Sequence, residues 1–128
     1  MRVSLVVLSV AGLALAVPSH AGPSADVNAQ SFYSTAVELK SKGMRAMFDG
    51  RTKTMQKQMK DAGLSARAAN LAATENGSPL FCVPDAARKK GLDAEQVIAI
   101  LGGLSQSTRS RLSLEAAWLE ALKRRYPC

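Results

Sequence analysis

Apolar residues recur every three or four positions along most of the chain, which is the period of an α-helix that buries one face. The first such stretch runs from about residue 24 to Lys42, and Ser24 or Asp26 is suited to cap its start. Gly43 follows its end, where a helix commonly stops at glycine. The apolar positions of this predicted helix are Phe32, Tyr33, Ala36, Val37 and Leu39.

A second helical stretch is predicted from about Thr52 to Glu75. Its apolar positions form one narrow seam: Met55, Met59, Ala62, Ala66, Ala69 and Ala73. Alanine has little side chain, so the seam predicts a close approach to a neighbouring helix. Gly63 and Ser65 could divide the stretch in two; we expect one long helix that is bent or weakened at Gly63.

The connector between these two helices, residues 44–50, contains two large apolar residues, Met47 and Phe48, before the turn signal Asp49-Gly50. An exposed binding loop is one interpretation of this pair. We expect the other, in which both side chains plug the core.

Two more helices are predicted in the C-terminal half. Asp93, with Gln96 three positions on, marks the start of one, and Gly102-Gly103 its end. The last begins between Ser105 and Thr108 and ends before Pro127, with Trp118 as a core anchor. A short turn or a single helical turn is expected over residues 85–91. The predicted class is therefore all-α, a small domain of four or possibly five helices.

The first 21 residues have the pattern of a secretory signal peptide. Arg2 precedes an apolar run, Val3 to Val17, and Ser19-His20-Ala21 places small residues before a cut after Ala21. The alternative is a retained membrane anchor, but spanning a bilayer takes about 20 apolar residues. We expect a periplasmic protein whose mature chain, residues 22–128, is one domain.

Cys82 and Cys128 are the only cysteines, and export to an oxidising compartment makes a disulfide between them the expected outcome. They are not spaced as Cys-x-x-Cys. The one histidine, His20, lies in the predicted leader, so a zinc site would need two carboxylates as well. No metal or cofactor is therefore expected.

The chain is basic, with a formal charge of +7. Lys53, Lys57, Lys60 and Arg67 lie nearly opposite the alanine seam and form a basic stripe. Such a stripe suits an acidic protein, an anionic lipid surface or nucleic acid, or it is a solvated face that keeps the protein soluble. No aromatic residue is interleaved with it, which argues against single-stranded nucleic acid.

The sequence offers little for catalysis. Histidine, the commonest general base, is missing after residue 21. The carboxylates are scattered, and Asp93 and Glu95 face different sides of their predicted helix. We therefore predict that the protein is not an enzyme.

Three features together resemble the Rap/Tai-type immunity proteins of type VI secretion. They are Phe81-Cys82-Val83-Pro84, the capped helix that starts at Asp93, and the terminal Tyr126-Pro127-Cys128. The resemblance covers residues 80–128 and implies that Cys82 pairs with Cys128. It also implies binding to a peptidoglycan amidase toxin in the periplasm.

Two functions are therefore expected as alternatives. The first is an exported binding protein that neutralises a toxin by covering its active site. The second is a structural or stress protein of the cell envelope, such as a small holdase, that acts at an anionic surface.

Overall fold

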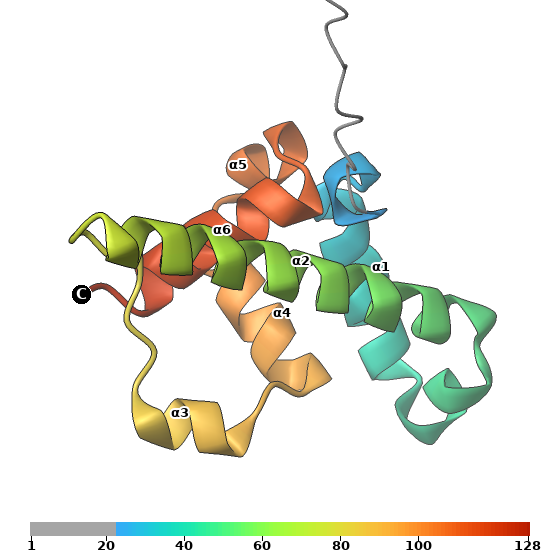
Figure 1. Cartoon of the computed structure of the whole chain (residues 1–128). Coiled ribbons are helices and arrows are strands. Elements are labelled where there is room, and N and C mark those ends of the chain that lie inside the picture. The colour runs from blue at the N-terminus through green and yellow to red at the C-terminus, as the bar shows by residue number, and fades with distance from the viewer. Residues whose placement is uncertain (1–22) are drawn as a thin grey trace, which may run out of the picture.

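The computed structural model describes residues 23–128, and every regular element among them is helical (Figure 1). The elements are the 3-10 helix η1 (Pro23–Asp26), α1 (Ala29–Ser41), the 3-10 helix η2 (Gly43–Phe48), α2 (Gly50–Glu75), α3 (Asp85–Lys90), α4 (Ala94–Gly102), α5 (Gln106–Arg111) and α6 (Leu114–Arg125). The all-α class is confirmed, but the expected number of four or five helices was wrong, since residues 23–128 contain six α-helices. The predicted leader, residues 1–21, lies outside the described residues.

The core is built around α6, whose inner face is buried along its whole length: Leu114, Ala117, Trp118, Ala121 and Leu122. Trp118 is 1% exposed, which confirms it as a core anchor. α2 packs along α6 more extensively than any other pair of elements packs. The seam residues Ala62 and Ala66 are buried there, and α2 runs unbroken through Gly63, so the prediction of one long helix is confirmed.

α1 packs against α4 and α5 on the other side of the core. α4 begins at Asp93, whose Oδ1 accepts a hydrogen bond from the Gln96 backbone N–H at 2.8 Å, as the sequence predicted. The short α3 has no buried residue and packs little on the other helices. Figure 1 shows it standing apart from them.

The expected cap of the first helix was wrong. Asn28 caps α1, accepting from the Ser31 N–H at 3.0 Å, whereas Ser24 is fully buried in η1. Its backbone N–H donates to Asp61 of α2 at 3.1 Å, and its hydroxyl lies in hydrogen-bonding range of both Asp61 and Glu115 of α6. Ser24 therefore holds the start of the described chain against α2 and α6.

The single last helix predicted from the sequence is two helices, α5 and α6. The backbone of residues 27–29 inserts at the break: Ala29 N–H donates to Leu112 O at 3.0 Å, and Leu114 N–H donates to Val27 O at 2.6 Å. These bonds occupy groups that a continuous helix would pair internally. Ser113 then caps α6 by accepting from the Ala116 N–H at 3.2 Å.

The prediction that Met47 and Phe48 plug the core was also wrong. Met44, Met47 and Phe48 are 80%, 73% and 89% exposed. Residues 43–48 form the tight turn η2 instead, because Thr52 Oγ1 donates to Ala46 O at 2.6 Å and Lys42 Nζ reaches Asp49 at 2.9 Å.

The predicted disulfide is confirmed: Cys82 and Cys128 are bonded, with their Cα atoms 5.0 Å apart. The Cys82 N–H also donates to Tyr126 O at 2.8 Å. Beside them, Asn70 of α2 accepts from the Leu80 and Phe81 N–H groups and donates to Phe81 O, at 2.8 to 3.1 Å. The tail of α6 and the loop before α3 are thus fixed to α2.

A buried arginine joins α1, α4 and α5. Arg109 is 7% exposed, and its guanidinium donates to the carbonyls of Leu101 and Leu104 at the end of α4. It also donates to Gln30 Oε1 at 2.7 Å and lies 4.0 Å from the centroid of the Tyr33 ring. Arg109 thereby satisfies buried carbonyls that a helix end otherwise leaves unpaired.

Removing the disulfide should destabilise the protein by about 4 kcal/mol, since the bond closes a loop in the unfolded chain between cysteines that are 46 positions apart. Chemical denaturation of oxidised protein, reduced protein and the double variant Cys82→Ala, Cys128→Ala measures this. The reduced protein and the double variant should agree. A difference below about 1 kcal/mol would contradict the chain-entropy account.

Replacing Arg109 with methionine should cost about 3 kcal/mol, because buried carbonyls would lose a charged donor. Arg111→Met is the matched control on the same helix: Arg111 is exposed, and among residues 23–128 its side chain bonds only Ser107 O, at 3.3 Å. Its cost should stay within about 0.5 kcal/mol. Equal effects of the two substitutions would show that the buried network contributes nothing.

Candidate functional site

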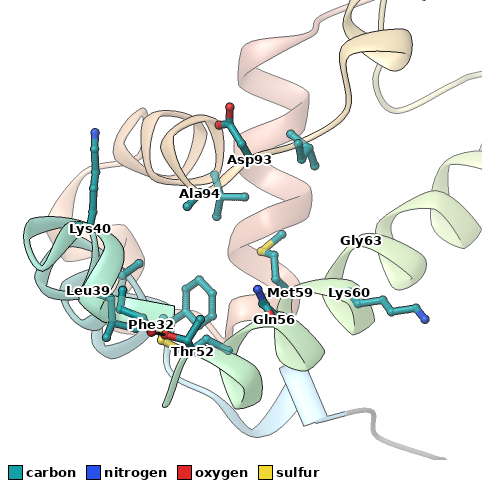
Figure 2. A pocket seen from close by; sticks show the side chains of 16 residues that line it. Phe32, Leu39, Lys40, Thr52, Gln56, Met59, Lys60, Gly63, Asp93 and Ala94 are labelled. Carbon is teal, nitrogen blue, oxygen red and sulfur yellow. Dashed lines mark hydrogen bonds between the residues drawn. The ribbon is translucent and has the colours of Figure 1, made fainter. Parts of the chain in front are cut away.

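A cleft of about 720 Å³ lies between the first half of α2, the length of α1 and the start of α4. Figure 2 shows its lining. Apolar side chains predominate: Phe32, Ala36, Leu39, Met55, Met59, Leu92, Ala94 and Val97. This volume falls within the range of sites that bind small molecules, and such sites are mostly apolar.

The floor and one wall of the cleft differ in burial. Phe32, Leu39 and Val97 form the floor, are 6–8% exposed and belong to the packed interior. Met55 and Met59 are only partly buried and come from one face of α2. Methionine is flexible and polarizable, so this wall is suited to adapt to an apolar group of varied shape.

The charged residues at the rim do not place their charges inside the cleft. Lys40 and Lys60 extend away from it in Figure 2, and Lys40 lies 3.6 Å from Glu95 in an exposed ion pair. The Asp93 carboxylate is already used as the cap of α4. The cleft therefore presents hydrophobic surface, with charge held at its edges.

The unequal lengths of α2 and α6 explain the cleft. α6 has 12 residues, about 18 Å, whereas α2 has 26, about 39 Å. The second half of α2 lies on α6, and its first half extends past it. Gly63 widens the cleft further, since a Cβ added there would meet no atom within 4 Å.

An ion-pair cluster fixes the corner where α1 turns into α2. The Arg51 guanidinium contacts Glu38 at 3.0 and 3.2 Å and Asp49 at 3.0 and 3.1 Å. Hydrogen bonds from Arg51 hold the pKa of both carboxyls below their usual values, and the pKa of Asp49 is lowered further by Lys42. Both acids are therefore ionised, and Arg51 and Lys42 balance their charges.

All four residues of the basic stripe, Lys53, Lys57, Lys60 and Arg67, are exposed on α2. None of them has a carboxylate within 4.0 Å among residues 23–128. Lys60 also edges the cleft. Exposed Leu64 and Leu71 share the outer face of the helix with the stripe. The stripe's role in binding a partner remains a prediction.

The two carboxylates that meet at Ser24, Asp61 and Glu115, were not linked by sequence reasoning. They are 54 positions apart in the chain, and only the packing of α2 on α6 joins them. The residues that the structure describes contain no group of three or more potential metal ligands. In the same region no helix has the length and hydrophobicity needed to cross a bilayer.

Comparison with known proteins gives no match: no protein family, no curated protein and no solved structure is similar to this chain.

The cleft should bind a neutral apolar dye such as Nile red, with increased fluorescence. Gly63→Leu should weaken that binding by about tenfold, because the new side chain would occupy the cleft. Lys57→Leu adds the same side chain to the outer face of α2 and should leave dye binding unchanged. Equal effects of the two substitutions would place the dye elsewhere.

Proposed function

We propose that the protein is an exported helical binding protein, similar in action to type VI immunity proteins, that neutralises a partner by occupying it. The observation that carries this proposal is the apolar cleft with its flexible methionine wall. A side chain or short apolar segment of a partner would fill the cleft and bury its partly exposed lining. Such anchoring contacts supply most of the energy of a protein interface.

The framework around the cleft supports a role in recognition. Asn70 and the disulfide fix one end of α2, and the Arg51 cluster fixes the other. A preorganised surface loses little entropy when it binds. On this proposal the protein blocks its partner sterically and catalyses no reaction.

Export is part of the same proposal. The two cysteines form a bond, as expected for a protein that folds in an oxidising compartment. Cleavage after Ala21 would release residues 22–128 into the periplasm. The resemblance of residues 80–128 to Rap/Tai immunity proteins suggests a peptidoglycan amidase as the partner.

A second candidate, an envelope protein that acts at an anionic surface, is favoured by a different feature. The exposed apolar residues of η2 lie outside the cleft in a strongly basic part of the chain.

Purification of the tagged full-length gene product from periplasm should yield a chain that begins at Gly22, by mass, in a stoichiometric complex with an amidase. The open reading frame beside the gene is the first place to look for that amidase. Adding the protein should abolish the amidase activity on peptidoglycan at one equivalent.

Gly63→Leu should weaken this complex by about tenfold, because it fills the cleft, whereas Lys57→Leu should change it less. The proposal would be contradicted if no amidase co-purifies with the protein, or if the amidase stays active when the protein is added.

A further inference from the structure

The corner formed by η2 carries three large apolar side chains that no other part of the described chain covers. Met44, Met47 and Phe48 are 80%, 73% and 89% exposed. They come from one 3-10 helix of six residues, which lies at the end of the molecule away from the C-terminus (Figure 1). We call these three residues the apolar tip. Water-soluble surfaces seldom expose so much apolar area in one place without a binding role.

The tip is held in a fixed shape. Ala46 O accepts from both Thr52 Oγ1 at 2.6 Å and the Asp49 N–H at 3.1 Å, and Lys42 Nζ lies 2.9 Å from Asp49. The Arg51 cluster closes the base of the turn. The exposure of the three side chains is therefore built into the fold, since the backbone that carries them is bonded on both sides.

Positive charge is concentrated in the sequence that forms the tip and the first part of α2. Residues 42–60 contain six cations and one acid, a net charge of +5, whereas the whole described chain carries +6. The cations are Lys42, Arg45, Arg51, Lys53, Lys57 and Lys60. The acids that face them, Asp49 from the turn and Glu38 from α1, are both bound by Arg51. Arg45, Lys53 and Lys57 have no carboxylate within 4.0 Å among residues 23–128.

We propose that the apolar tip inserts into the interface of an anionic lipid bilayer, with the surrounding cations on the headgroups. Exposed apolar side chains ringed by lysine and arginine are the combination that binds such interfaces. The net charge of +5 over residues 42–60 favours an anionic surface as the binding partner. This surface is distinct from the cleft interior. The proposal rests on the second candidate function and deepens it, since it names the kind of surface and the residues that contact it.

The binding test uses the mature protein and vesicles of phosphatidylglycerol mixed with phosphatidylcholine, followed by sedimentation. The protein should bind these vesicles, should not bind pure phosphatidylcholine, and should be released as salt is raised. Replacing Met44, Met47 and Phe48 together with serine should weaken binding by roughly a hundredfold. Replacing Lys53 or Arg45 with glutamine should cost about fivefold each.

The matched control is Leu71→Ser, which removes an apolar side chain that is 55% exposed at the far end of α2. Leu71 lies 21 residues beyond Gly50, about 32 Å along the helix, and its loss should leave vesicle binding unchanged. Circular dichroism and thermal unfolding should be the same for all variants, since every substituted side chain is exposed.

Depth of insertion is measured separately with Phe48→Trp. Its fluorescence should shift to the blue on vesicles and be quenched by brominated lipid, above the constant signal of the buried Trp118. Leu71→Trp should show neither effect. The vesicle experiments contain no partner protein. Their result therefore does not depend on whether the protein forms the complex with an amidase that is expected in periplasm.

Equal binding to neutral and anionic vesicles, equal losses for the tip and Leu71 variants, or no fluorescence shift for Phe48→Trp would overturn the proposal. The proposal would also be overturned if the wild-type protein does not bind vesicles and the tip variant loses a protein partner. The tip would then belong to a protein interface.

Discussion

The close packing of α2 on α6 is the contact on which the rest of the structure depends. Ala62 and Ala66 of α2 and Ala117 and Ala121 of α6 are all at most 3% exposed. Small side chains let the two backbones approach, and Trp118 then fills the core beside them. Because α6 is less than half as long as α2, the same contact leaves the first half of α2 free to form one wall of a cleft.

The two ends of α2 are fastened by different chemistry. At its C-terminal end, Asn70 and the disulfide fix the loop before α3 and the tail of α6. At its N-terminal end, Arg51 joins α2 to Glu38 of α1 in a cluster that solvent can reach. Surface ion pairs contribute little free energy on their own, so this corner depends more on its turn hydrogen bonds. These turn hydrogen bonds hold Met44, Met47 and Phe48 in solvent, although none of the three packs in the core.

The cleft and the tip offer two kinds of surface on one small domain. The cleft is concave and has methionine in its lining, whereas the tip exposes three apolar side chains in a basic stretch of the chain. A protein partner and an anionic bilayer are therefore distinguishable by experiment, because each should respond to substitutions that leave the other unchanged. A chain that binds both would act on its partner at the membrane surface.

The sequence by itself determined the helical class, the long α2, the cap at Asp93 and the pairing of Cys82 with Cys128. These features depend on local periodicity, on capping chemistry and on having only two cysteines to pair. Tertiary structure decided the rest. The break at Ser113 exists because residues 27–29 bond there, and Ser24 is buried because α2 and α6 enclose it. Phe48 is exposed because hydrogen bonds from Lys42 and Thr52 fix the turn that carries it, and the pattern of apolar residues gives no sign of those bonds.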